Sequence, residues 1–171
     1  PCCLAELADR TGKSHWTLLN LGELDEEHLI QRCGLTPTDL LHATGAFRRW
    51  DAACSAAACD IYAGLLGQSP QEFIERCLTE FVRRLSIEIL KKRLDGHADP
   101  DGLDECEVCQ FLTDSIISDG GPLGLSARLK DPIIGIGAPV HYFLPRAAER
   151  LNTEAVIPRD ADVANAIGAI T

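Results

Sequence analysis

Hydrophobic positions recur at three- and four-residue steps through one long segment of the chain, residues 70–94. They are Phe73, Ile74, Cys77, Leu78, Phe81, Val82, Leu85 and Ile89. This spacing is typical of an amphipathic helix whose apolar stripe faces a core. Ser69 and Glu72 have the spacing of a capping box that begins the helix, and Gly96 ends it. At about 1.5 Å per residue, the helix would be roughly 36 Å long.

Shorter helices are predicted on both sides of this segment. Asp25 and Thr36 are residue types that cap helix N-termini, and Pro37 and Asp39 suit the first turn after Thr36. Capping accounts for the whole segment 36–39 and leaves His42 unexplained. The predicted helices cover residues 4–10, 26–33, 37 to about 45, 51–66 and 106–117. Residues 15–21 have the composition of a short strand, residues 97–104 are a predicted polar loop, and residues 118–122 are a candidate lid or hinge.

The last forty residues predict the order strand, glycine turn, helix, strand, helix. Pro145 would cost about 3 kcal/mol inside a helix, so we expect the first of these two helices to begin near Leu144. The crossover between the two strands should be right-handed and the strands parallel. Two strands among many helices predict a helix-rich α/β class with a small sheet. The predicted elements are a strand at 133–134, a strand at 153–158 and a small-residue helix at 162–170.

Length and charge narrow the classes of protein. The 171 residues suit a single domain or lobe, which we divide into a helical part (1–95), a linker with a Cys-x-x-Cys helix (96–131) and the strand–helix unit (132–171). Sixteen Lys and Arg against 26 Asp and Glu give a net charge of −10. Nucleic acid and membranes are therefore not expected as partners, because both nucleic acid and anionic membranes attract a basic surface.

The chain has eight cysteines, and whether they are free thiols or disulfides depends on the redox state of the cell compartment. No secretory leader is visible and several cysteines fall on apolar helix faces, so we expect free thiols in a reducing cytoplasm. Cys106 and Cys109 have the spacing of zinc ligands, which makes Zn²⁺ a candidate cofactor. One alternative is two thiols on a helix face, one packed and one exposed. Another is a thioredoxin-like redox pair, but that role expects a helix start after a strand, and no strand is predicted before Cys106. A zinc site would need further ligands from Cys2, Cys3, Cys33, His97 or a second chain.

Three segments near the C-terminus carry a family resemblance. They are the turn Gly135-Ile-Gly-Ala-Pro139, the strand Val156-Ile-Pro158 and the run Ala164-Asn-Ala-Ile-Gly-Ala169. With Gly34–His42 and Trp50–Ala53 upstream, they resemble the hydantoinase and oxoprolinase family of the actin-like (ribonuclease H-like) ATPase fold. The resemblance implies the C-terminal lobe of that fold.

The resemblance also implies a nucleotide site. It places Gly135, Gly137, Ala138, Asn165 and Gly168 against ATP, whose Mg²⁺ would come with the missing lobe. Pro139 has no N–H, so we expect no phosphate contact there. The alternative for the turn is a tight strand-to-helix connection without a ligand, and the alternative for the terminal run is close backbone packing.

The activity implied by the resemblance is ATP-dependent opening of a small cyclic amide such as 5-oxoproline or a hydantoin. This chain would contribute the adenosine side of the cleft; no catalytic residue is assigned, and alone it should not turn over ATP. We expect it to be a C-terminal portion that works with a missing N-terminal part or a second subunit. One alternative is a non-catalytic nucleotide-sensing or partner-reactivating module of the same superfamily, and another is a helical domain whose likeness is only architectural.

Overall fold

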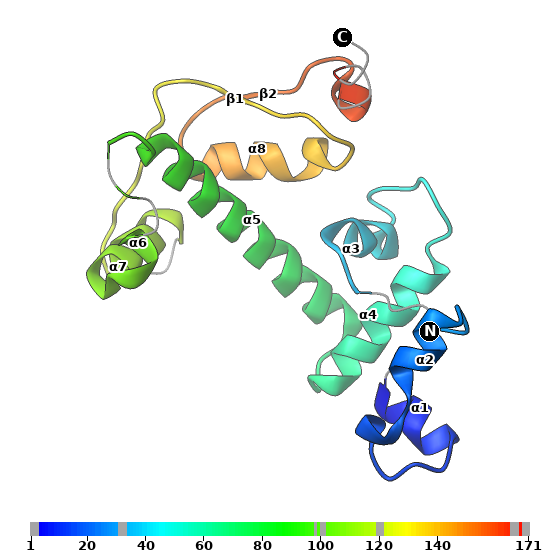
Figure 1. Ribbon diagram of the computed structural model, residues 1–171. Coiled ribbons are helices and arrows are strands. Elements are labelled where there is room, and N and C mark those ends of the chain that lie inside the picture. The colour runs from blue at the N-terminus through cyan, green and yellow to red at the C-terminus, as the bar shows by residue number, and fades with distance from the viewer. Residues whose placement is uncertain are drawn as a thin grey trace. The chain divides into compact units, whose positions relative to one another are not determined.

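The computed structural model describes residues 4–30, 34–97, 99, 102–118, 122–164 and 168 (Figure 1). The chain divides into two compact units, Pro1–Leu78 and Thr79–Thr171. Helices dominate the described residues, which also contain one two-stranded sheet. The predicted helix-rich α/β class is therefore confirmed at this coarse level. Among the described residues, no helix is long and apolar enough to cross a bilayer.

The first unit is built from short helices. They are α1 (Leu4–Arg10), the 3-10 turn η1 (Trp16–Leu18), α2 (Leu21–Glu26), α3 (Pro37–Thr44), α4 (Ala53–Leu65) and the first turns of α5 (Pro70–Leu94). The predictions of α1, α3 and α4 are confirmed. In α3 both halves of the capping box form between Thr36 and Asp39, and Gly45 ends the helix with a left-handed φ of 73°.

Two predictions in this unit are wrong. Residues 15–21 do not form a strand, because His15 folds back to accept the Thr17 N–H at its Nδ1 and begins the 3-10 turn η1. The helix predicted at 26–33 is displaced toward the N-terminus. Asp25 lies inside α2 instead of capping a helix, and His28 stops the helical path with a φ of 57°. Residues 31–33 lie outside the described residues.

The core of the first unit lies where α3, α4 and the start of α5 pack. Leu41 and Ala63 are fully buried, and the rings of Tyr62 and Phe73 stack with their centroids 6.0 Å apart. Each large aliphatic or aromatic side chain removed from water contributes about 1.5–3 kcal/mol before the entropy of ordering it is subtracted. The other buried apolar residues here are Leu40, Cys59, Ile74 and Leu78.

The second unit contains the rest of α5 and the sheet. Its other elements are α6 (Gly102–Glu105), α7 (Glu107–Ile117), β1 (Ile133–Ile134), α8 (Val140–Arg150), β2 (Ala155–Val156) and the 3-10 turn η2 (Ala161–Val163). The predictions of α5 and α7 are confirmed, whereas the predicted loop 97–104 includes the beginning of α6. Ile87, Ile117 and Leu151 form the centre of the core.

The two strands pair in parallel, as the sequence predicted, with Ile133 opposite Ala155 and Ile134 opposite Val156. The predicted start of the intervening helix is wrong, because α8 begins at Val140 and Pro145 lies inside it. The helix tolerates Pro145 because it buries one whole face, and that burial offsets the backbone bond that proline cannot donate. The buried residues of α8 are Phe143, Leu144, Ala147 and Ala148.

Candidate functional site

The segments that follow β1 and β2 meet at the carboxyl edge of the sheet. The Gly135 N–H donates to the Val156 carbonyl at 3.0 Å, and the Gly137 N–H donates to the Ala161 carbonyl at 2.7 Å. The first bond continues the parallel ladder and the second fastens the glycine turn to η2. In open α/β sheets this edge is where ligands bind.

The two glycines of the turn have different physical roles. Gly135 is buried, and a Cβ there would lie 2.3 Å from Val140 Cγ2 and 2.4 Å from Leu144 Cδ2. Glycine at this position therefore lets α8 pack on the strand. Gly137 has a φ of 109°, and nothing lies within 4 Å of the position its Cβ would take. The turn thus leaves open space beside Gly137, although the N–H of this residue is already used within the fold.

Aliphatic side chains of the turn, of η2 and of the strand ends are exposed. Ile136, between the two glycines, is 55% exposed, and Val163 of η2 is 48% exposed. Ile134 and Val156, the last residues of the two strands, are also exposed. Exposed apolar side chains at a sheet edge are candidates for contact with a ligand or a partner.

The remaining residues implied by the family resemblance are Ala138, Gly168 and Asn165. Ala138 is half-buried within the turn, and Gly168 is helical and exposed. Asn165 lies outside the described residues, as does most of the predicted helix 162–170. The structure thus places Gly135, Gly137 and Ala138 in one turn at the sheet edge.

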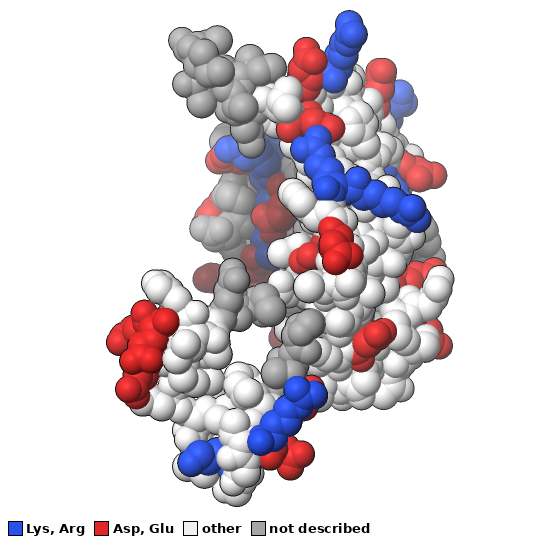
Figure 2. Space-filling view, turned by 90° about the vertical axis from the view of Figure 1, so that its right-hand side faces the viewer, with Lys and Arg blue, Asp and Glu red and all other residues white. Residues whose placement is uncertain are grey.

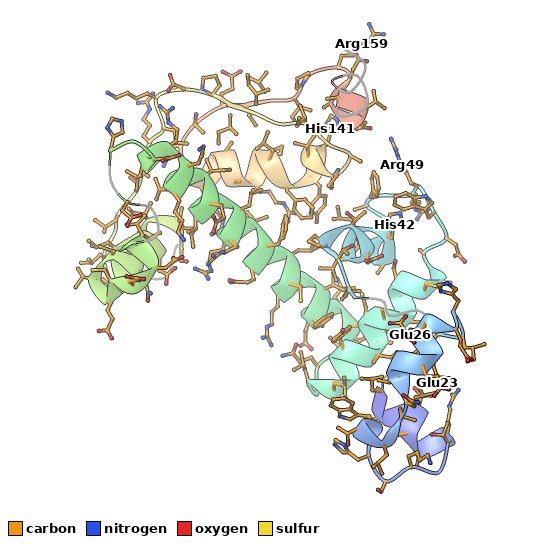
Figure 3. The ribbon with its side chains drawn as sticks, in the orientation of Figure 1. Glu23, Glu26, His42, Arg49, His141 and Arg159 are labelled. Atoms are coloured by element: carbon orange, nitrogen blue, oxygen red, sulfur yellow. The ribbon has the colours of Figure 1, made fainter. Side chains whose placement is uncertain are left out.

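One contact at this edge is not indicated by any pattern in the sequence. His141, on the first turn of α8, lies with its Nε2 3.7 Å from Asp162 Oδ1 of η2 (Figure 3). Both side chains are partly exposed. No local spacing pattern joins positions 141 and 162, because only the strand crossover brings them together. The pair adds a titratable and an anionic group to the rim of the candidate site.

His42, which capping left unexplained, has a packing role. Its Nδ1 lies 2.8 Å from the Thr38 carbonyl, and its Nε2 accepts the Arg49 N–H at 3.3 Å. The ring stacks on Trp50 at 5.2 Å and meets the edge of Phe47 at 5.1 Å. Figure 3 shows His42 on α3 and Arg49 on the segment that follows it. Both ring nitrogens are occupied, so His42 fastens the α3–α4 connection and does not offer a free base.

Cys106 and Cys109 lie on the first turn of α7. Cys106 is the N-cap residue, and its sulfur accepts the backbone N–H of Cys109 at 3.4 Å. Among the described residues, no group of three or more His, Cys, Asp or Glu side chains is placed to hold a metal ion. Cys2, Cys3 and Cys33, the further zinc ligands considered from sequence, lie outside the described residues.

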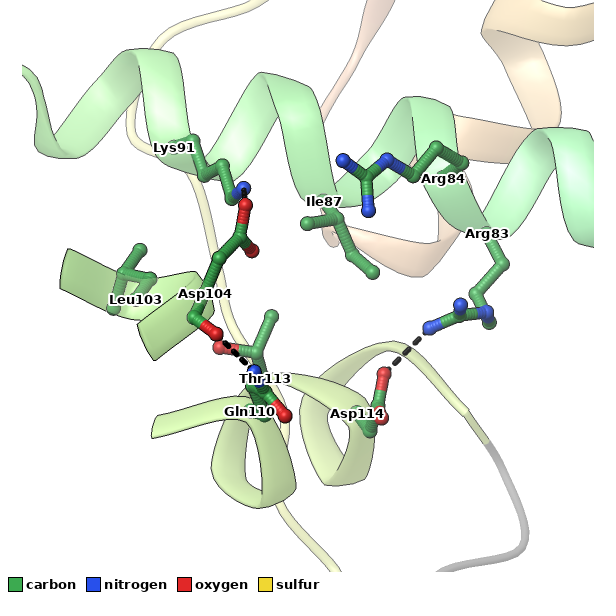
Figure 4. Close-up of a pocket in the computed structure, with 9 residues that line it drawn as sticks. All are labelled: Arg83, Arg84, Ile87, Lys91, Leu103, Asp104, Gln110, Thr113 and Asp114. Carbon is green, nitrogen blue, oxygen red and sulfur yellow. Dashed lines mark hydrogen bonds and ion pairs between the residues drawn. The ribbon is translucent and has the colours of Figure 1, made fainter. Parts of the chain in front are cut away.

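A cavity of about 310 Å³ lies between α5 and the α6–α7 pair of the second unit (Figure 4). Its cations are each paired with a carboxylate. Lys91 Nζ binds Asp104 Oδ2 and Arg83 binds Asp114, both at 2.5 Å, and Arg84 lies 3.0 Å from Glu88, which is outside the lining. The Lys91 ammonium holds the pKa of Asp104 below its usual range. An anion could bind here only by displacing these carboxylates. The ion pairs therefore serve mainly to join α5 to α6 and α7. Figure 2 shows acidic and basic side chains interspersed elsewhere on the face in view.

Comparison with known proteins adds no assignment, since no family model, curated protein or solved structure matches this chain.

Proposed function

We propose that this chain supplies the adenosine side of an ATP site in an ATP-dependent cyclic-amide hydrolase similar to the hydantoinases and oxoprolinases. The observation that carries the proposal is the Gly135–Pro139 turn at the carboxyl edge of two parallel strands. A Cβ at Gly137 would meet no atom within 4 Å, and Ile136 of the turn and Val163 of η2 are both exposed. A nucleobase can lie against backbone that has no Cβ and against exposed apolar side chains, and this turn offers both.

The turn is preorganised for this role by the bond from Gly137 to Ala161. That bond fixes the backbone before any ligand arrives, so little entropy would be lost on binding. It also uses the Gly137 N–H, and Pro139 has none, so the proposed contact is with the adenosine moiety and not with the phosphates. In such a reaction, ATP supplies the phosphoryl group that converts the amide oxygen into a leaving group.

The described residues do not hold a metal cluster, so no Mg²⁺ ligand is assigned to them. The proposed contribution of this chain is therefore binding and orientation of the adenosine. Turnover would depend on groups that position the phosphates and the cyclic amide, and we place those groups in another part of the polypeptide or in a second subunit.

Calorimetric titration of the chain with ATP and ADP, in the presence of magnesium, tests the proposal. Ile136→Asp should abolish binding by placing a charge beside the ring, and Gly137→Val should abolish it by filling the open space. Because valine at a φ of 109° strains the backbone, Ile136→Asp is the cleaner of the two variants. Leu65→Asp is the matched control, since Leu65 is an exposed aliphatic residue of the first unit.

Binding that survives in Leu65→Asp and disappears in Ile136→Asp would support the adenosine site. Absence of binding by the folded wild-type chain would contradict the proposal and favour an interaction module without a nucleotide. Equal binding by wild type and Ile136→Asp would place any nucleotide site elsewhere.

A further inference from the structure

The first turn of α7 brings two thiols together in a way that packing alone does not require. Cys106 has an extended backbone, with φ −104° and ψ 111°, and points its sulfur back over the helix start. There the sulfur accepts the N–H of Cys109 at 3.4 Å. The side chain of Cys109 branches from the same residue that donates this bond, so the two thiols share one helical turn.

We propose that Cys106 and Cys109 form a redox-active dithiol that exchanges with low-molecular-weight disulfides. This activity is independent of the proposed nucleotide site. The N-cap position is where a helix presents unpaired N–H groups and the positive end of its dipole, and both stabilise a thiolate. With 11 residues, α7 is long enough to have this end effect.

The pKa values of the two thiols are shifted in opposite directions. Hydrogen bonds from the Cys109 thiol and backbone lower the pKa of Cys106. The same interaction raises the pKa of Cys109, because its thiol is the donor. Cys106 is therefore the attacking sulfur and Cys109 the resolving one.

Nearby carboxylates oppose the thiolate and are only partly neutralised. Glu105 and Glu107 flank Cys106 in the chain, and Asp104 lies two residues before it. Asp104 is paired with Lys91 of α5, which reduces its effect. Among the described residues, no ion pair is formed by Glu105 or Glu107, so the helix terminus and the Cys109 hydrogen bonds have to outweigh these two carboxylates.

Accessibility distinguishes this pair from a packed cysteine. Cys106 and Cys109 are half-buried, and Val108 between them is 65% exposed, so a small disulfide can reach the turn. Cys59 on α4 is only 1% exposed, and burial raises the pKa of its thiol. A buried thiol of that kind is inert.

The exchange proceeds in two balanced steps. The Cys106 thiolate attacks one sulfur of the external disulfide, forming a mixed disulfide and releasing one external thiolate, which takes up a proton. Cys109 then loses its proton and attacks the Cys106 sulfur, forming the internal disulfide and releasing the second external thiolate, which is protonated. The two protein thiols are oxidised, the external disulfide is reduced to two thiols, and the two protons pass to those products.

The test treats the whole chain with oxidised glutathione in the presence of EDTA, then blocks free thiols by alkylation and digests with trypsin. Cleavage after Arg93 and Arg128 gives one peptide, 94–128, in which Cys106 and Cys109 are the cysteines. We expect this peptide to lose two hydrogens and to escape alkylation at both sulfurs, and dithiothreitol to reverse the change. Peptide 50–76, which contains Cys54 and Cys59, is the internal control.

Two variants separate the roles. Cys109→Ser should trap glutathione on Cys106, because the resolving thiol is absent. Cys106→Ser should abolish the internal disulfide while preserving α7, since serine is a preferred N-cap residue; far-UV circular dichroism checks the helix content. Cys54→Ser, which removes an exposed cysteine of the first unit, should leave the 94–128 disulfide unchanged.

Separate glutathionylation of Cys106 and Cys109 without an internal disulfide would overturn the proposal. So would glutathione on Cys106 of the Cys109→Ser variant at no higher level than on exposed Cys54.

Discussion

Asp39 holds together the start of α3 and its contact with α4, and its removal gives the sharpest stability prediction. One carboxylate oxygen accepts the Thr36 N–H at 2.9 Å and the Thr36 hydroxyl at 2.6 Å. The other accepts the Ser55 hydroxyl at 3.0 Å. Asp39→Ala therefore removes half of a capping box, a charge at the helix N-terminus and a link between two helices.

The magnitude follows from these parts. Loss of the capping interaction and of the dipole contribution should cost about 1 kcal/mol, because this end of α3 is largely exposed. Ser55 is buried, so its hydroxyl loses its acceptor where water is scarce, at a cost of about 1–2 kcal/mol. Together, Asp39→Ala should reduce the free energy of unfolding of the first unit by about 2–3 kcal/mol. Ser55→Ala, which removes the donor as well, should cost less.

Urea unfolding followed by tryptophan fluorescence measures this loss, because both tryptophans, Trp16 and Trp50, lie in the first unit. The hydrogen bonds from Thr36 lower the pKa of Asp39 below its unfolded value. Its stabilisation is therefore fully present above an unfolded pKa of about 3.9 and is lost as the pH falls through the folded pKa. Wild type and Asp39→Asn should accordingly converge in strong acid. A loss below about 0.5 kcal/mol for Asp39→Ala, or a wild-type to Asp39→Asn difference that does not change with pH, would refute the reasoning.

Three further predictions concern the second unit and are measured by urea unfolding followed by far-UV circular dichroism. Gly135→Ala should destabilise it by about 1–3 kcal/mol, because the added methyl overlaps Val140 and Leu144; a neutral result would show that α8 can move away. Leu151→Ala should cost about 2–5 kcal/mol, because Leu151 is fully buried in the core; a loss below 1 kcal/mol would contradict this. Ser86→Ala should change stability by less than about 1 kcal/mol, because the Ser86 hydroxyl only adds a bond to a helical carbonyl and leaves no orphaned donor when removed.

Local signals in the sequence predicted the elements whose ends are determined by nearby residues. Ser69 with Glu72 and Thr36 with Asp39 both form capping boxes, so α5 and α3 begin where the sequence indicated. The prediction failed where a longer-range factor decided the structure. Pro145 argues locally for a late helix start, yet the buried face of α8 keeps it helical. At His28 a left-handed backbone, unusual for a residue other than glycine, ends α2 early.

The candidate site shows the same division between local and long-range causes. The sequence located the Gly135–Pro139 turn but could not assign different roles to its glycines, since the clash at Gly135 arises from α8 and the open space at Gly137 from the path toward Ala161. Cys106 was expected inside a helix, but it is the N-cap residue, and its sulfur accepts the Cys109 N–H at the helix start.

The distinction between the two glycines also determines how a variant in this turn should be interpreted. A substitution at Gly135 acts first on the packing of α8, so a loss of nucleotide binding there would not locate a ligand. Ile136 contributes an exposed side chain and no special backbone angle, so a change there alters the surface and spares the fold. When a ligand covers exposed aliphatic side chains at the sheet edge, the free energy falls by about 25 cal/mol for each Å² of apolar surface removed from water. Binding measured on Ile136 variants therefore tests whether a nucleotide buries this side chain, independently of the stability of the turn.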